Sequence, residues 1–182
     1  DYYVEVEGDV TTKKEITEYF SFYCPACYKQ EPFMNELKAM LPADATFKKN
    51  HVDGMPGREP TIELGLTKAL ITAKLLKVEE QITAAIFNYI HVNKANFDNE
   101  KDIKNLFLLQ GIDSKKLDKT FASFSVNMQA KKMQKNTADL RRQGHTSVPT
   151  LIVNGKYKPV TKNIKSLDEY KQLILFLLNK TT

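Results

Sequence analysis

The segment Phe20-Ser21-Phe22-Tyr23-Cys24-Pro25-Ala26-Cys27-Tyr28 holds both cysteines of the chain, separated by two residues. A disulfide between cysteines this close restricts the unfolded chain very little, so it would be a weak structural crosslink. The spacing therefore favours a redox role. Half of a metal site, or two unrelated buried thiols, are the alternatives.

A strand pattern enters this segment and a helical pattern leaves it. Residues 15–22 predict a core strand, and helical spacing follows at Glu31, Met34, Leu37 and Leu41, before Pro42. At a helix N-terminus, unpaired N–H groups and the helix dipole favour a thiolate at Cys24, and Pro25 suits the first helical position. We expect the exposed Cys24 to react first and the deeper Cys27 to resolve the mixed disulfide.

Strand patterns near both ends of the chain enclose a helical middle. Short strands are predicted at residues 4–6 and 46–52, and helical patterns run from about residue 61 to residue 143. These include a helix over residues 98–110, ended by Gly111, and the longest helix, from Ser114 to about Arg141. The pair Asn154-Gly155 predicts a type I′ hairpin, and Ser166 with Glu169 predicts the cap of a final helix.

Composition is that of a globular protein, with 42% hydrophobic and 27% charged residues in a chain of 182. The longest apolar run, residues 173–178, is too short to span a bilayer. The formal charge is +5, and the basic run from Lys131 to Arg142 follows a helical pattern, so we interpret it as a solvated helix face rather than a nucleic-acid site. The opening residues, Asp1-Tyr2-Tyr3-Val4, have no secretory signal pattern, so a signal has either been removed or was never present.

The order of these features resembles the DsbA family of thioredoxin-fold thiol:disulfide oxidoreductases. The most specific parts are residues 20–28 and the segment Ser147-Val148-Pro149-Thr150-Leu151-Ile152-Val153-Asn154-Gly155-Lys156-Tyr157. The resemblance implies an α/β thioredoxin fold with a large all-helical insertion. The expected domains are a thioredoxin-like domain of residues 1–54 and 142–182, and an inserted helical domain of residues 55–141.

The resemblance also implies a set of residues beside the cysteines. Pro149 is expected as a cis-proline, Val148 as a residue that offers backbone groups to an extended substrate peptide, and Thr150 as a supporting residue. Pro25 and Ala26 are expected to contact substrate as well. Sequence alone would favour a trans bond at Pro149, because most X-Pro bonds in folded proteins are trans.

Glu18, six residues before Cys24, is implied to be a buried acid near Cys27, with Lys49 as its partner. A buried carboxylate could relay a proton to or from Cys27 during exchange. From its residue type alone, Glu18 would be an ordinary polar residue on one face of a strand.

One position departs from the family pattern. Well-known oxidising members carry a histidine where this chain has Ala26, which can neither donate a hydrogen bond nor carry charge. We therefore expect a weaker stabilisation of the Cys24 thiolate and a less oxidising couple. His51, His91 and His145 are not assigned to replace it, because such residues are more often structural or exposed.

The resemblance thus implies a monomeric periplasmic oxidase, in its mature form, that donates the Cys24–Cys27 disulfide to folding secreted proteins and is reoxidised by a membrane partner of the DsbB type. No metal or cofactor is expected, since there is no second cysteine pair or paired histidine. An isomerase or reductase of the same fold is the nearest alternative, although the short segment before the core strand weakens the isomerase interpretation. A peptide-binding chaperone is the alternative from a different class.

Overall fold

The computed structural model describes residues 1–181, and they divide into two compact units. The first contains Asp1–Phe20, Lys29–Asn50 and the described residues from Asp139 onward, and the second contains Ser21–Tyr28 and His51–Ala138. The domain boundaries expected from the sequence, after residue 54 and before residue 142, stay a prediction.

The first unit is built on a five-stranded sheet of order β1-β5-β4-β2-β3. The strands are β1 (Tyr3–Glu5), β2 (Lys14–Phe20), β3 (Ala45–His51), β4 (Thr150–Val153) and β5 (Tyr157–Pro159). The central pair is antiparallel, with Glu18 opposite Leu151, and β1 pairs antiparallel with β5 at the edge. The strand patterns predicted from the sequence are confirmed to within about two residues.

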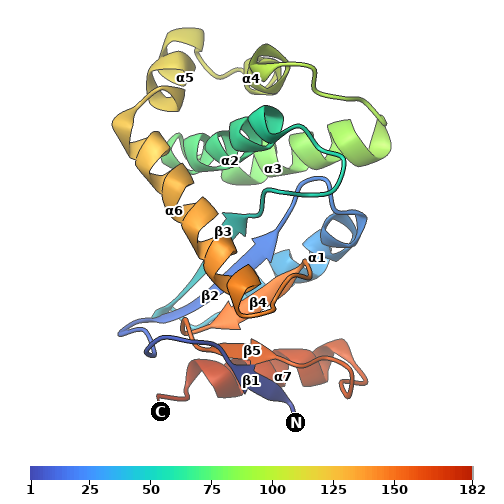
Figure 1. The fold of residues 1–182 in the computed structure, drawn as a ribbon, viewed down its shortest axis with the longest axis vertical. Helices are drawn as coiled ribbons and strands as arrows, with labels where there is room; N and C mark the ends of the chain where they lie inside the picture. Colours follow the sequence, from blue (N-terminus) through green and yellow to red (C-terminus); the bar gives the residue numbers. More distant parts are fainter. Residues whose placement is uncertain (182) are drawn as a thin grey trace. The chain divides into compact units, whose positions relative to one another are not determined.

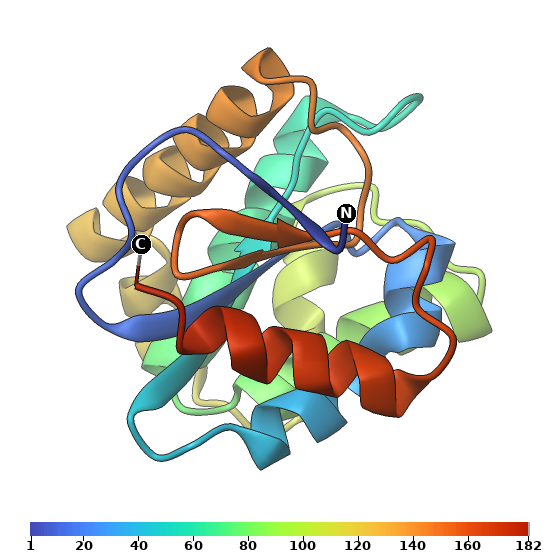
Figure 2. The ribbon, with the colours of Figure 1, turned by 90° about the horizontal axis from the view of Figure 1, so that it is seen from below.

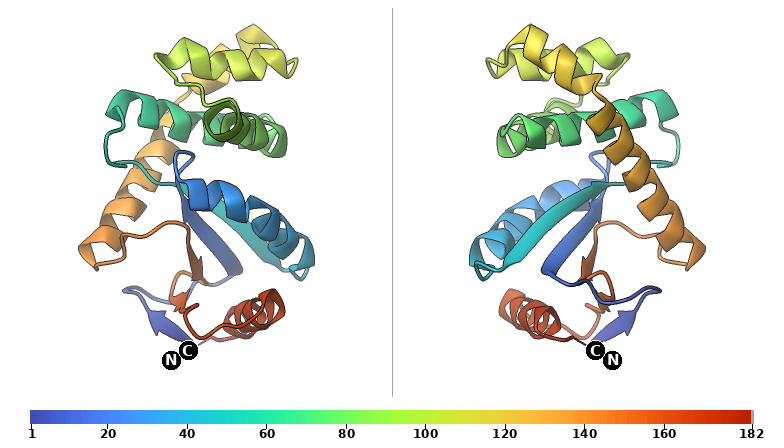
Figure 3. Two further views of the ribbon diagram at one scale, coloured as in Figure 1. Left: turned by 90° about the vertical axis from the view of Figure 1, so that its right-hand side faces the viewer. Right: turned by 90° about the vertical axis from the view of Figure 1, so that its left-hand side faces the viewer.

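Two helices cover one face of this sheet, as Figure 3 shows. They are α1 (Pro25–Met40) and α7 (Leu167–Leu178), and α7 lies along β4 and β5 in Figure 2. Alternation along β4 explains the arrangement: Leu151 and Val153 join the core with both helices, whereas Ile152 packs on the other face with Leu140. A strand buried on both faces is consistent with the unbroken apolar run of β4.

The β4–β5 turn and the cap of α7 confirm two local predictions. Asn154 and Gly155 have φ angles of 53° and 66°, the positive values that a type I′ turn requires at both central positions. Ser166 Oγ accepts a hydrogen bond from the N–H of Glu169 at 3.1 Å, while the Glu169 carboxylate accepts one from the N–H of Lys165. The cap is therefore present, with its reciprocal bond one residue earlier than in a standard capping box.

The second unit is helical. Figure 1 shows α2 and α3 in one layer with α4 and α5 over them, and α6 passes alongside α2. The helices are α2 (Pro60–Leu75), α3 (Glu79–Phe87), α4 (Glu100–Leu109), α5 (Ser114–Phe121) and α6 (Phe124–Arg142), with a π-helical segment η1 (Asn88–Val92) after α3. Between residues 1 and 181, no helix is both long and apolar enough to cross a bilayer.

The single helix predicted from Ser114 to about Arg141 is wrong, because the chain breaks it into α5 and α6. Ala122 leaves helical geometry with a ψ of 0°. Ser123 then caps α6, since its Oγ accepts a hydrogen bond from the N–H of Val126 at 3.2 Å. A serine favours such a cap over a helix interior, and this signal outweighs the continuous helical pattern around it.

Candidate active site

The cysteine motif occupies the turn from β2 into α1. Cys24 directly precedes the first helical residue, Pro25, and its N–H donates to the carbonyl oxygen of Ser21 at 3.1 Å. Its own carbonyl oxygen accepts from the N–H of Tyr28 at 3.1 Å, which is the first hydrogen bond of the helix. The missing N–H of Pro25 costs nothing at this position.

The structure has Cys24 and Cys27 as buried thiols. Cys24 is 6% exposed and Cys27 is 0% exposed, so Cys24 is the more accessible sulfur, as the helical spacing predicts. The N–H of Cys27 donates to Cys24 Sγ at 3.2 Å. The sulfur of Cys24 therefore accepts a backbone hydrogen bond at the N-terminal end of α1.

Two histidines hold the backbone of Phe22, two residues before Cys24. The N–H of Phe22 donates to Nε2 of His51 at 3.3 Å, and the carbonyl oxygen of Phe22 accepts from Nε2 of His91 at 2.7 Å. Neither histidine was predicted to have a role. Nothing local marks them, because they lie 29 and 69 residues from Phe22 along the chain.

His51 is neutral in this arrangement. Because its Nε2 accepts from Phe22, its Nδ1 carries the proton and donates to Thr67 Oγ1 at 2.8 Å, and that hydroxyl donates to the carbonyl oxygen of Glu63. Burial lowers the pKa of His51 to about 3. The ring therefore keeps its acceptor nitrogen for Phe22 throughout the physiological range.

His91 also contacts the residue that follows the motif. Its ring stacks on Tyr28, with the centroids 5.1 Å apart and an interplanar angle of 11°. His91 lies in the π-helical segment η1, a distortion often found at functional sites. His91 therefore contacts one residue that precedes the cysteine pair, Phe22, and one that follows it, Tyr28.

A buried charge cluster lies within the first unit. Lys49 Nζ donates to Glu18 Oε1 at 2.7 Å and to Glu31 Oε2 at 2.9 Å, and Glu18 is completely buried. Glu18 Oε2 has no hydrogen-bond partner among residues 1–181. The pairing of Glu18 with Lys49 was expected, whereas Glu31 was not, although an acid among the core positions of a helix was a visible signal.

Burial sets the protonation of this cluster. It raises the pKa of Glu18, with the Glu31 carboxylate adding to the effect and Lys49 opposing it. Burial lowers the pKa of Lys49, but attraction to Glu18 and Glu31 outweighs it, and the pKa of Lys49 rises overall. One ammonium thus faces two carboxylates, and burial favours the protonated form of Glu18.

The remaining predicted residues lie in two short segments. The Val148–Pro149 bond is cis, as the resemblance implied. Thr150 begins β4, and its Oγ1 donates to the carbonyl oxygen of Ser147 at 2.7 Å. Pro25 and Ala26 are exposed at the start of α1. Cys24, Cys27, Pro25 and Ala26 belong to the second unit, and Glu18, Lys49 and residues 148–150 to the first.

Other polar groups are not part of the cysteine motif. His145 contacts Lys158 Nζ at 3.1 Å, and burial and this lysine lower its pKa. Within residues 1–181, no group of three or more His, Cys, Asp or Glu side chains is placed to hold a metal ion.

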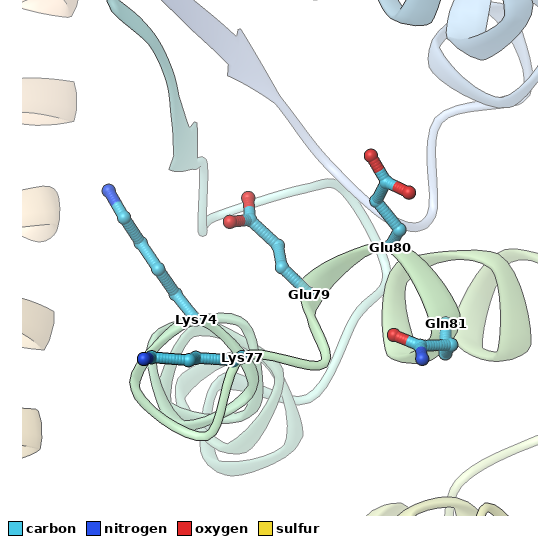
Figure 4. A pocket seen from close by; sticks show the side chains of 5 residues that line it. All are labelled: Lys74, Lys77, Glu79, Glu80 and Gln81. Carbon is cyan, nitrogen blue, oxygen red and sulfur yellow. The ribbon is translucent and has the colours of Figure 1, made fainter.

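A shallow pocket lies between α2 and α3. In Figure 4 the charged and polar side chains that line it diverge rather than meeting at one point; they are Lys74, Lys77, Glu79, Glu80 and Gln81.

Known proteins match nearly the whole chain. The family model described as DSBA-like thioredoxin domain matches residues 15–174. The thiol:disulfide interchange protein DsbA of Pectobacterium carotovorum is 31% identical, covering 98% of this chain and 86% of the relative. DsbA of Yersinia pestis is 32% identical over the same shares.

Solved structures give the same result. DsbA of Proteus mirabilis, in a complex with the non-covalently bound peptide PWATCDS, has a TM-score of 0.85 and 26% identity, covering 98% of this chain and 96% of the other. DsbA of Pseudomonas aeruginosa has a TM-score of 0.78 and 27% identity, covering 97% and 90%. The predicted thioredoxin fold with an all-helical insertion is confirmed.

Proposed function

Because the chain belongs to the family of DSBA-like thioredoxin domains and is a thiol:disulfide oxidoreductase, we propose that it works in the oxidising direction, giving the disulfide of Cys24 and Cys27 to folding secreted proteins. The enzyme class predicted from the sequence is confirmed by the same relatives. The direction, the individual residue roles and the compartment are the content of the proposal.

The reaction is two successive exchanges. A substrate thiolate attacks Cys24 Sγ of the oxidised protein, the bond between Cys24 and Cys27 breaks, and Cys27 leaves as a thiolate that takes up a proton. A second substrate thiolate then attacks the substrate sulfur of the mixed disulfide, and Cys24 leaves as a thiolate. Two electrons pass from the substrate to the protein, and the substrate gains one disulfide.

The observation that carries the oxidising direction is the hydrogen bond from the N–H of Cys27 to Cys24 Sγ at the start of α1. Groups that stabilise the leaving thiolate of Cys24 stabilise the reduced protein and so raise the reduction potential. The oxidised form has no thiolate and gains nothing from them. Reduced protein should therefore unfold at higher denaturant concentration than oxidised protein near pH 7.

Glu18 is proposed as the proton acceptor and donor for Cys27, with Lys49 as its supporting partner. The raised pKa of the buried Glu18 carboxyl supports this role, since a group that exchanges a proton near neutrality needs a pKa moved upward from that of an exposed carboxyl. Glu18→Gln should slow the exchange and remove one ionisation from its pH profile.

Substrate contacts are proposed for two segments. The backbone of Val148 would pair with an extended peptide next to Pro149, with Thr150 supporting the segment through its bond to Ser147. Exposed Pro25 and Ala26 would contact the same peptide at the start of α1. Val148→Pro would block backbone pairing and should raise KM for peptide substrates.

Enzymes of this family act on substrate proteins and need a redox partner. A periplasmic location, a membrane reoxidant of the DsbB type and a monomeric state are our proposals for this chain. The similarity to relatives named DsbA supports them. Sedimentation of the purified protein tests the monomer, and oxygen-dependent reoxidation by membranes tests the partner.

The deciding experiment is the reduction potential of the Cys24–Cys27 pair in a glutathione buffer. Thioredoxin has a potential of about −270 mV and well-studied oxidising DsbA proteins about −120 mV. A value well above that of thioredoxin supports the proposal, whereas a thioredoxin-like value would favour a reductase or isomerase. Ala26→His is the matched variant and should raise the potential, because a histidine adds a donor or charge for the thiolate.

Trapping with single variants tests the order of the two cysteines. Cys27→Ser leaves Cys24 without a resolving thiol, so mixed disulfides with substrate should accumulate, and Cys24→Ser should accumulate few. Equal trapping by both variants would contradict the assignment. A chaperone would keep suppressing aggregation in Cys24→Ser, while an oxidase would lose its activity.

A further inference from the structure

The loop between β3 and α2 is anchored by a buried acid. Glu63 is 1% exposed, and its two carboxylate oxygens accept hydrogen bonds from the N–H groups of Gly54 and Met55, each at 3.0 Å. The N–H of Arg58 donates to the carbonyl oxygen of Met55 at 3.2 Å and closes a turn. Figure 2 shows the loop extending beyond the first turn of α2.

This anchored loop places Arg58 on the residue next to Cys24. The guanidinium carbon of Arg58 lies 4.0 Å from the centroid of the Tyr23 ring. Tyr23 is itself fixed, since its N–H donates to Ser21 Oγ at 3.1 Å and its neighbour Phe22 is bonded to two histidines. Because the contact with the ring already restricts the guanidinium, less entropy is lost when its N–H groups bind a further partner.

The side-chain N–H groups of Arg58 make no hydrogen bond and no ion pair with any of residues 1–181. The nearby acid Glu63 directs its two oxygens at the N–H groups of Gly54 and Met55 instead. Arg58 is exposed, so the edge of its guanidinium, the part that binds a carboxylate with two parallel hydrogen bonds, is accessible to a substrate.

We propose that Arg58, held on Tyr23, binds the carboxylate of an acidic residue beside the reacting cysteine of a substrate polypeptide. The inference rests on the proposed function and adds a substrate preference to it. The exposed residues of the motif itself, Pro25 and Ala26, are uncharged and cannot select for charge. Because Tyr23 directly precedes Cys24, the selected carboxylate belongs to a residue within about two positions of the substrate cysteine.

The test uses dithiol peptides that differ in one residue. Glu, Gln or Lys is placed directly before or directly after the reactive cysteine, and the second-order rate of oxidation by oxidised protein is measured at low ionic strength. The Glu peptide should react about 2- to 5-fold faster than the Gln peptide in at least one placement, as for an exposed ion pair. The Lys peptide should be slowest. Salt at 0.5 M should reduce the preference.

Three variants locate the effect. Arg58→Gln should abolish the Glu preference and leave the rate of the Gln peptide unchanged, and Arg58→Lys should keep only part of it, because lysine lacks the planar two-pronged donor. Lys131→Gln removes the same charge from an exposed position of α6 and should keep the full preference. Circular dichroism of each variant checks folding, and the Glu-to-Gln rate ratio within one variant is independent of its overall activity.

The outcomes separate the inference from the proposed function. If the wild-type protein fails to oxidise even the Gln peptide, the proposed function fails. If it oxidises all peptides at equal rates, or if Arg58→Gln keeps the Glu preference, the inference about Arg58 is overturned while the proposed function stands.

Discussion

Lys49 Nζ lies 2.7 Å from Oε1 of Glu18, a carboxylate that is completely buried. The second oxygen of Glu18 has no hydrogen-bond partner within the described chain. Lys49 therefore supplies most of the stabilisation of the negative charge on Glu18. The two residues form a coupled pair whose members cannot be removed singly without a large cost.

Lys49→Met should lower the free energy of unfolding by about 3–5 kcal/mol at pH 7, because it leaves an uncompensated carboxylate in the core. Denaturant titration measures this loss. The matched control is the double variant Glu18→Gln/Lys49→Met, which removes the buried charge and should recover part of the stability. If the double variant is no more stable than Lys49→Met, the loss comes from packing and not from charge.

The pH dependence of the pair has a defined sign. Burial raises the pKa of Glu18 above its ordinary 4.5, so between these values the folded protein holds a proton that the unfolded chain has released. Stability should therefore fall as pH rises from about 4.5 through the folded pKa. Glu18→Gln should lack this fall, and Lys49→Met should extend it to higher pH, since the attraction that lowers the pKa is gone.

Titration of His51 gives the free energy of unfolding the opposite dependence on pH. Its pKa is about 3 in the folded protein against 6.5 ordinarily, so the unfolded chain takes up a proton first as pH falls. Stability should drop by up to roughly 5 kcal/mol as pH falls from about 6.5 toward 3. His51→Gln, which can still accept and donate hydrogen bonds, should remove this part of the pH dependence. An unchanged slope in the variant would contradict the neutral, buried assignment.

Local patterns in the sequence predicted much of the structure. The cysteine turn, the Asn154-Gly155 hairpin and the Ser166 cap depend on residues within a few positions of one another, so the sequence alone contains their geometry. The cap at Ser123 was also local, yet the helical pattern on both sides concealed it. His51 and His91 could not be assigned, because their bonds to Phe22 are formed only when distant segments pack.

Asn154 shows that one residue can serve a local and a distant purpose. Besides its turn geometry, its Oδ1 accepts from the N–H of Glu15 at 3.0 Å, and its Nδ2 donates to the carbonyl oxygens of Leu177 and Leu178. The turn was predictable from the dipeptide. The connection from β2 to the end of α7 was not, because it spans the chain.

Asn154→Gly should keep the positive φ but lose these hydrogen bonds, lowering the free energy of unfolding by about 2–4 kcal/mol. Asn154→Asp should be unstable at pH 7, since a carboxylate would face the carbonyl ends of α7, and should recover stability when protonated at low pH. Thermal unfolding at pH 4 and pH 7 distinguishes the two variants. Equal losses for Asp at both pH values would contradict a donor role for Nδ2.

His91 is expected to position the cysteine pair, because it bonds to Phe22 before the pair and stacks on Tyr28 after it. His91→Gln keeps a donor for the Phe22 carbonyl and loses the stack, whereas His91→Phe keeps the stack and loses the donor. His91→Phe should cost about 1 kcal/mol of stability, the net value of one hydrogen bond.

The rate of disulfide transfer separates positioning from stability. If the bond to Phe22 sets the placement of Cys24, His91→Phe should slow transfer to peptides under conditions where it is fully folded, and its reduction potential should shift, while His91→Gln retains most of the wild-type rate. A merely structural histidine would leave the rate and the potential of the folded variant unchanged. Because Tyr28 follows Cys27 directly, a rate loss confined to His91→Gln would instead identify the stack as the feature that positions the motif.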